Sequence, residues 1–467
     1  MLKTNWRQSS LLKGGLHTTT TQGQEEKNLL DRHLGRRELL KAGVCVGAAA
    51  ATTPALACFR SDQAPLIQKH PAPPEVEMLA SKEYGQKQVS KFQAAVRKAG
   101  LDALVISNRC LDYEGYVCNY HPSSAQPGVV FLPAQGAPKL FVQMYSSAHA
   151  RFAKRTLWID DVVDVSKDPV SETTSENFYK ELVTTLKDRK LTRGKIGLAG
   201  GEVDWMLPAY FKSVLPDLRV TDANEVLWNQ IYVKNEAEIA LMKYTARISD
   251  EVAIPLIKRM LVPGTLDTDI FTEVLHAMRE AGADTSMLIL GAAPYSAGIW
   301  ATEAQDRPIA KGDIVLCEPI ITSHGYQTER MFTFAVGKPE DIPESQKRGA
   351  QVIYEAFQIT LEGMKPGREL RDVYEKTNNY IKSKGYAEGS TVLIGHFIGQ
   401  QNHEGPRITS EGTKGIILQP NMVISWHPNV VVPGDGGVRT ICSSTLLITN
   451  NGVEMMSKLP MEPMVYV

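Results

Sequence analysis

The feature that most constrains the fold is a near-repeat in the C-terminal half of the chain. The run Leu261–Gly264, which reads Leu-Val-Pro-Gly, precedes a segment whose apolar residues recur at helical spacing. The run Met364–Gly367, which reads Met-Lys-Pro-Gly, precedes a second such segment. Each segment ends at a glycine that marks a turn, Gly282 in the first and Gly385 in the second. Because two copies are too few for a solenoid, the pattern predicts one pseudo-symmetric domain made of two α/β halves.

Upstream of this repeat, short apolar runs alternate with segments of helical periodicity. We expect a helix that ends at Gly100 and another around Phe178–Leu186. Short runs rich in β-branched and aromatic residues predict strands at 104–106, 129–132, 140–142 and 195–198. Strands that alternate with helices imply a layered α/β domain. A boundary follows near Asn229, after which Val233 opens a long amphipathic helix.

The first residues of the chain are typical of an export signal. Arg36 and Arg37 precede the apolar run Ala42–Ala51, and Ala55–Ala57 supplies a small-x-small cleavage pattern. The run is shorter than the ~20 residues that a transmembrane helix needs. We therefore expect no transmembrane helix and a periplasmic protein, with lipidation of Cys58 as an open alternative.

Four segments result from these patterns. A twin-arginine-type signal is expected over 1–58, and an extended proline-rich linker over 59–82. The α/β domain is expected over 83–228, and the pseudo-symmetric domain over 229–467.

Charge and cysteine content exclude several functions. The chain carries 51 basic and 52 acidic side chains, a formal net charge of -1. Such a balance gives no field that would recruit nucleic acid. No pair of cysteines has the CxxC spacing of a zinc knuckle or redox motif. The expected partner is a small molecule or a short peptide.

Two histidines stand in a glycine-rich segment that ends in proline. The first lies in Gly395–Gly399, which reads Gly-His-Phe-Ile-Gly, and the second in His403–Pro406, which reads His-Glu-Gly-Pro. This pattern resembles the Gly-His-Gly-x-Gly…His-Glu-x-Pro element of the creatinase, prolidase and aminopeptidase P family. Lys234 with Glu238 and Ile239 resembles the family's entry into its catalytic domain.

The resemblance covers roughly Tyr84 to Pro460 and implies a mixed α/β (α+β) architecture. It predicts a creatinase-like N-terminal domain, followed by a C-terminal pita-bread domain with an internal pseudo-duplication. It also implies a homodimer.

The resemblance places the family's five metal ligands at Glu318, Glu329, His396, His427 and Ser443. The last two replace carboxylates that bridge two ions in metal-dependent relatives. A dinuclear centre is therefore not expected. The remaining donors, Glu318, Glu329, His396 and His427, suit a single zinc or iron, and a site without metal is the alternative.

Further residues are candidates for catalysis and substrate binding. His403 is expected as the general acid/base, with Glu318, Glu329 and His396 around the reacting centre. Trp300 and Trp426 would either form an aromatic wall for a cationic group or pack in the core. The candidate carboxylate clamps are two arginines, Arg407 and Arg439.

The predicted function is hydrolysis of a C–N bond in a small amidino, amide or peptide-like substrate, with at most one metal. Three alternatives stay open: a Xaa-Pro-type metalloaminopeptidase, a lyase of a small sulfonium or betaine compound, and a non-catalytic binding protein on the same scaffold.

Overall fold

The structure is a computed structural model of the chain. It describes residues 70–107, 113–121, 128–143, 156–165, 174–200, 206–292, 304–386, 394–432 and 438–467. The predicted signal and most of the predicted linker lie outside the described residues, as do Cys58 and Trp300.

The N-terminal domain is a six-stranded mixed sheet between two helical layers. Its strand order is β4-β3-β2-β1-β5-β6, and the central strand β1 pairs antiparallel with β2 and parallel with β5. Cores of apolar residues lie on both faces of this sheet. The strands are β1 (Ala103–Ser107), β2 (Gly128–Pro133), β3 (Lys139–Val142), β4 (Val162–Asp164), β5 (Lys195–Ala199) and β6 (Arg219–Asp222).

Within the described residues, five helices accompany this sheet, and two of them confirm the periodicity in the sequence. They are α4 (Lys82–Lys98), α5 (Gly115–Cys118), α7 (Thr174–Asp188), α8 (Met206–Val214) and α9 (Asn224–Ile231). Helix α4 begins because the Ser81 side chain accepts a hydrogen bond from the backbone N–H of Tyr84. It buries Phe92 and Val96 against the sheet, as their spacing predicts.

One part of the predicted linker is folded. Residues Glu75–Ala80 form helix α3, and its Leu79 is buried in a cluster with Leu241 and Met242 of the C-terminal domain. The expectation of an extended, unpacked segment is therefore wrong over these residues. The prolines that suggested it end at Pro74, which stands at the N-cap of α3, where a missing N–H costs no helical hydrogen bond.

The C-terminal domain opens on the expected long helix, three residues later than Val233. Asn235 caps α10 (Glu236–Ile248) through a capping box with Glu238, which satisfies the free N–H groups at the start. The helix runs on through a π-helical turn at Ser249–Ala253 into α11 (Ile254–Met260). The other helices are α12 (Asp267–Ala281), α13 (Glu344–Gly363) and α14 (Leu370–Ser383).

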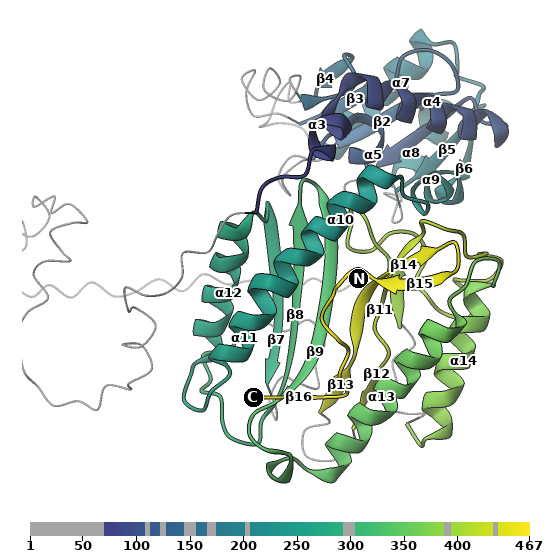
Figure 1. The fold of residues 1–467 in the computed structure, drawn as a ribbon. Coiled ribbons are helices and arrows are strands. Elements are labelled where there is room, and N and C mark those ends of the chain that lie inside the picture. The colour runs from purple at the N-terminus through teal and green to yellow at the C-terminus, as the bar shows by residue number, and fades with distance from the viewer. Residues whose placement is uncertain are drawn as a thin grey trace, which may run out of the picture. The chain divides into compact units, whose positions relative to one another are not determined.

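The strands of this domain form one sheet with the order β10-β11-β14-β9-β8-β7, while β15 pairs with β14 and β16 with β9. Helices α10, α11 and α12 pack on the β7–β9 half, and α13 and α14 pack on the β10–β14 half (Figure 1). The strands are β7 (Thr285–Ala292), β8 (Ile314–Ser323), β9 (Tyr326–Ala335), β10 (Gly395–Phe397), β11 (Val423–Trp426), β14 (Ser443–Thr449), β15 (Gly452–Met455) and β16 (Val465–Tyr466). A separate ribbon pairs β12 (Asn429–Val431) with β13 (Arg439–Ile441).

The two halves confirm the duplication predicted from the near-repeat. Helix α12 ends at Gly282, which has a left-handed φ of 119°, and Gly385 after α14 has a φ of 92°. Glycine adopts this conformation without steric cost, which is why it marks both turns. Each half then continues into strands of the shared sheet.

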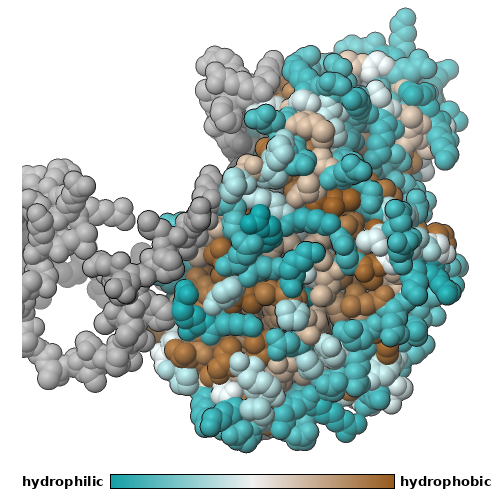
Figure 2. Space-filling view, viewed as in Figure 1, coloured by the Kyte–Doolittle hydropathy of each residue, from teal (hydrophilic) through white to brown (hydrophobic). Residues whose placement is uncertain are grey.

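The surface is mostly hydrophilic on the face shown in Figure 2, with apolar residues visible between the helices of the C-terminal domain. Within the described part of the chain, no helix is both long and apolar enough to span a bilayer.

Candidate metal centre

A row of polar side chains crosses the face of the C-terminal sheet that the helices leave uncovered. His396 on β10 stands opposite Ser425 on β11, which stands opposite Thr445 on β14. The Thr445 hydroxyl accepts a hydrogen bond from the backbone N–H of Glu329 on β9 at 3.0 Å and donates to its carbonyl at 3.1 Å. Opposed residues of antiparallel strands share a face. The row is therefore a consequence of strand register.

Three more candidates lie on this face, because each is two residues along its strand from Ser425, from Thr445, or from Ile320, which stands opposite Glu329. They are His427 just past the end of β11, Ser443 on β14 and Glu318 on β8. The period of two in a strand brings them to the same side as the row. Residues at the alternating positions, such as Trp426, pack instead against α13 and α14.

Glu329, His396 and His427 form the centre of the site. The Nε2 atom of His396 lies 3.2 Å from Oε1 of Glu329, and Nε2 of His427 lies 4.0 Å from the same oxygen. One ligand atom from each residue can be chosen so that all lie within 4.8 Å of one another. All three side chains are buried. Two imidazoles and one carboxylate facing a common point are adequate donors for one transition metal.

Neighbouring groups fix the orientation of these donors. The Nδ1 atom of His396 lies 3.1 Å from the carbonyl oxygen of Phe397, which leaves Nε2 directed at Glu329. Asn402 donates to Oε2 of Glu329 at 2.8 Å, and the Ser425 hydroxyl donates to Oε1. Both carboxylate oxygens therefore have partners that hold them in place.

The charges of the three donors are coupled. Burial alone would raise the pKa of Glu329, but the positive charge and hydrogen bond of His396 outweigh it and lower that pKa. Burial likewise opposes ionisation of His396, yet Glu329 raises the pKa of that imidazole. Burial and the charge of His396 lower the pKa of His427 to about 3. The three side chains thus form one ion pair and one neutral imidazole, and a cation would displace the proton of His396.

Glu318 differs from Glu329 in its charge. Its side chain is buried, and burial together with the negative charge of Glu329 raises its pKa well above the usual range. It does not belong to the group of three donors whose atoms lie within 4.8 Å of one another. Glu318 therefore holds its proton more strongly than a solvent-exposed glutamate does.

Ser443 stands where a carboxylate would be needed for a second ion. It lies opposite Met331 on β9, and its hydroxyl is buried without a hydrogen-bond partner among the described residues. A neutral hydroxyl cannot bridge two divalent cations as a carboxylate does. Ser443 therefore adds no carboxylate to the three donors.

His403 lies over this cluster and remains open to solvent. Its ring stacks on that of His396, with centroids 3.9 Å apart and an angle of 34° between the planes. Partial desolvation and then the charge of His396 lower the pKa of His403, and the exposed Arg407 lowers it further. The imidazole is therefore neutral at pH 7 and can accept a proton.

Two models of known families match almost the whole described chain. The model of the creatinase/prolidase N-terminal domain matches residues 88–230, and that of metallopeptidase family M24 matches residues 240–450. The chain belongs to the creatinase, prolidase and aminopeptidase P family. The predicted fold, a creatinase-like domain followed by a pita-bread domain, is confirmed, and the chain is assigned to the M24 hydrolases.

Curated relatives in this family are named as peptidases. An uncharacterised peptidase of Bacillus subtilis is 27% identical over 269 residues, which are 57% of this chain and 74% of the relative. A Xaa-Pro dipeptidase of Pyrococcus horikoshii is 27% identical over 240 residues, which are 51% of this chain and 66% of the relative.

A solved structure shows the same fold. The Xaa-Pro dipeptidase of Bacillus anthracis superposes with a TM-score of 0.67 at 21% identity, over 82% of this chain and 100% of that one.

One predicted substrate-binding residue lies elsewhere in this M24 domain. Trp426 is fully buried in the core beneath α13 and α14, which agrees with the core-packing alternative and not with an aromatic wall. Strand alternation explains the outcome, because Ser425 and His427 face the cluster and the residue between them must face away.

Arg439, one of the two candidate carboxylate clamps, lies on β13 and donates a hydrogen bond to Asn429. The other candidate, Arg407, is exposed.

Sequence reasoning missed Ser425, Asn402 and Thr445, which orient the centre. Their signal was present, since Ser425 precedes His427 by two positions and Asn402 adjoins His403. Thr445 becomes recognisable only when the register of β14 against β9 is known.

Proposed function

We propose that the chain hydrolyses the amide bond of short peptides of the Xaa-Pro type with one transition metal per chain. The observation that carries the proposal is the cluster of Glu329, His396 and His427. A set of two histidines and one glutamate is a known ligand set of catalytic zinc. When bound, the ion would polarise the scissile carbonyl and activate water.

His403 is the proposed general acid/base. It lies above the cluster with its ring open to solvent, so a substrate can reach it. A neutral imidazole can take the proton that water releases on attacking the carbonyl carbon and return it to the leaving nitrogen. The C–N bond breaks, the hydroxyl remains on the carbonyl carbon, and the nitrogen leaves protonated.

Glu318 and Arg407 have supporting roles in this proposal. The raised pKa of Glu318 favours a protonated carboxyl beside the cluster, which could donate a hydrogen bond to an oxygen that gains charge during attack. Arg407 is exposed and acts electrostatically on His403, so it is placed to attract the carboxylate of a dipeptide.

The proposal predicts that purified protein releases alanine and proline from the dipeptide Ala-Pro. A chelator should reduce the rate by at least about a hundredfold, because loss of the ion removes several kcal/mol of transition-state stabilisation. One equivalent of zinc or ferrous iron per chain should restore it. Amino-acid analysis of the products is the measurement, and Ala-Ala serves as the comparison substrate.

Two outcomes would contradict this proposal. An unsaturated product instead of two amino acids would indicate a lyase. A chelated protein with full Ala-Pro turnover would show that the cluster does not supply the chemistry through a metal.

A further inference from the structure

The loop that carries His403 is tied to the N-terminal domain. This loop, residues 399–405, follows β10. The backbone N–H of Gln400 in the loop donates to the Tyr116 hydroxyl at 2.8 Å. The hydroxyl of Tyr113 donates to the carbonyl of His403 itself at 3.3 Å. Both tyrosines are buried and lie in or just before helix α5, which belongs to the N-terminal sheet domain.

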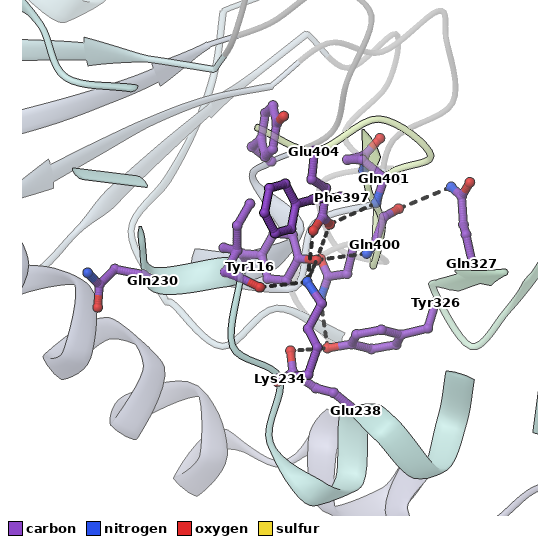
Figure 3. A network of polar contacts seen from close by, with 12 residues as sticks. Tyr116, Gln230, Lys234, Glu238, Tyr326, Gln327, Phe397, Gln400, Gln401 and Glu404 are labelled. Atoms are coloured by element: carbon purple, nitrogen blue, oxygen red, sulfur yellow. Dashed lines mark hydrogen bonds and ion pairs between the residues drawn. The ribbon is translucent and has the colours of Figure 1, made fainter. Parts of the chain in front are cut away.

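A buried ion pair completes this attachment. The Nζ atom of Lys234 lies 2.8 Å from Oε2 of Glu404, and their side chains are 1% and 0% exposed. The Tyr116 hydroxyl donates to the other oxygen of Glu404 and accepts from Lys234 at 3.0 Å (Figure 3). Lys234 also donates to the carbonyl of Ile231 at 2.6 Å, and Ile231 is the last residue of α9. We call Tyr116, Lys234 and Glu404 the interdomain triad.

Hydrogen bonds hold the loop on both sides of His403. Glu404 follows His403 directly and donates its backbone N–H to Phe397 at 2.9 Å, while its carboxylate accepts from the N–H of Gln401 at 3.2 Å. A side chain at Gly399 would collide with Lys234 and Tyr116. Asn402, the residue before His403, is held by Glu329.

We propose that the interdomain triad positions the His403 imidazole over the cluster of Glu329, His396 and His427. Tyr116, Lys234 and Glu404 are positioning residues, because they contact one another and the loop that carries His403, and none of them belongs to the cluster. The N-terminal domain thereby becomes part of the catalytic apparatus. The inference rests on the proposed role of His403.

The chemistry of the interdomain triad fits positioning better than simple stabilisation. A buried ion pair gives little net stability compared with apolar residues of the same volume, because both charges lose their water. A network in which every polar group has a hydrogen-bond partner instead makes the surrounding structure rigid and favours a single conformation. Here its two charges and one hydroxyl all contact the few residues that flank His403.

Tyr116→Phe is the variant that tests this inference, because it keeps the ring and the ion pair and removes only the hydroxyl. Tyr244→Phe is a matched control. Tyr244 is similarly buried, at 6%, and its hydroxyl donates to the backbone carbonyl of His70 at 3.0 Å, which lies outside residues 398–405.

On Ala-Pro, Tyr116→Phe should lower kcat about ten- to hundredfold and leave KM within about twofold, because a small displacement of a catalytic group costs that much. In a His403→Ala background it should cause no further loss, since it acts through His403. Amide hydrogen exchange over residues 398–405 of the full chain should be faster in Tyr116→Phe than in wild type. Tyr244→Phe should match wild type in kcat and in exchange over residues 398–405.

Unchanged exchange over 398–405 in Tyr116→Phe would overturn the inference, and this measurement needs no substrate. The inference would also be overturned if the kcat losses of Tyr116→Phe and His403→Ala multiplied in the double variant, because Tyr116 would then act independently of His403. If His403→Ala keeps full turnover while the exchange difference persists, the proposed function of His403 fails and the attachment of the loop stands.

Discussion

Replacing His396 with alanine should remove the bound metal and lower turnover of Ala-Pro by at least about three orders of magnitude. The imidazole supplies one of three donors, and its loss leaves Glu329 and His427, which are too few to hold a catalytic ion. Elemental analysis and kcat of the same preparation measure both effects. The fold should persist, because His396 lies on a short strand of three residues at the end of the sheet path.

His276→Ala is the control for this variant. His276 lies on helix α12, is exposed, and pairs only with Glu280 one turn further along. The control should keep both metal and activity. A His396→Ala protein that retains a full equivalent of metal would show that the ion is bound elsewhere.

Replacing His403 with alanine should lower kcat by about two to four orders of magnitude and leave the metal in place, because proton transfer is lost while the donors remain. His403 is exposed, so its removal opens no cavity in the core. Thermal unfolding and metal content should therefore match wild type. Single-turnover kinetics on Ala-Pro separate the chemical step from binding. A fully active His403→Ala variant would remove this residue from the reaction.

Much of the fold could be predicted because the sequence patterns are local. The spacing of Phe92 and Val96 and the β-branched run at 104–106 depend only on helix and strand periods, and both appear in α4 and β1. The near-repeat likewise predicted the two halves of the pita-bread domain, because a Pro-Gly pair precedes a helix in each half.

The site was predictable only in part because it depends on register. The motif at 395–406 identified His396 and His403, but it could not reveal that Ser425 and Thr445 lie between His396 and Glu329. The two alternatives for Trp426 could not be separated for the same reason, since one position along a strand separates the cluster from the core.

The interdomain triad could not be predicted from the sequence at all. Tyr116 and Glu404 are 288 positions apart, and no local pattern links a tyrosine in one domain to a glutamate in the other. Lys234 was recognised as part of the family's entry into the catalytic domain, but its partner is fixed only when both domains are folded.

The number of metal ions per chain tests the central claim most directly. The claim is that Glu329, His396 and His427 form a site for one ion and that Ser443 provides no bridge to a second. Protein should be loaded with excess zinc or ferrous iron, freed of loose ions by gel filtration, and analysed for metal against protein concentration. The account predicts one equivalent in wild type and less than about a tenth in Glu329→Gln, whose amide is a poor ligand for these ions. Two tightly bound equivalents in wild type, or one equivalent that persists in Glu329→Gln, would contradict it.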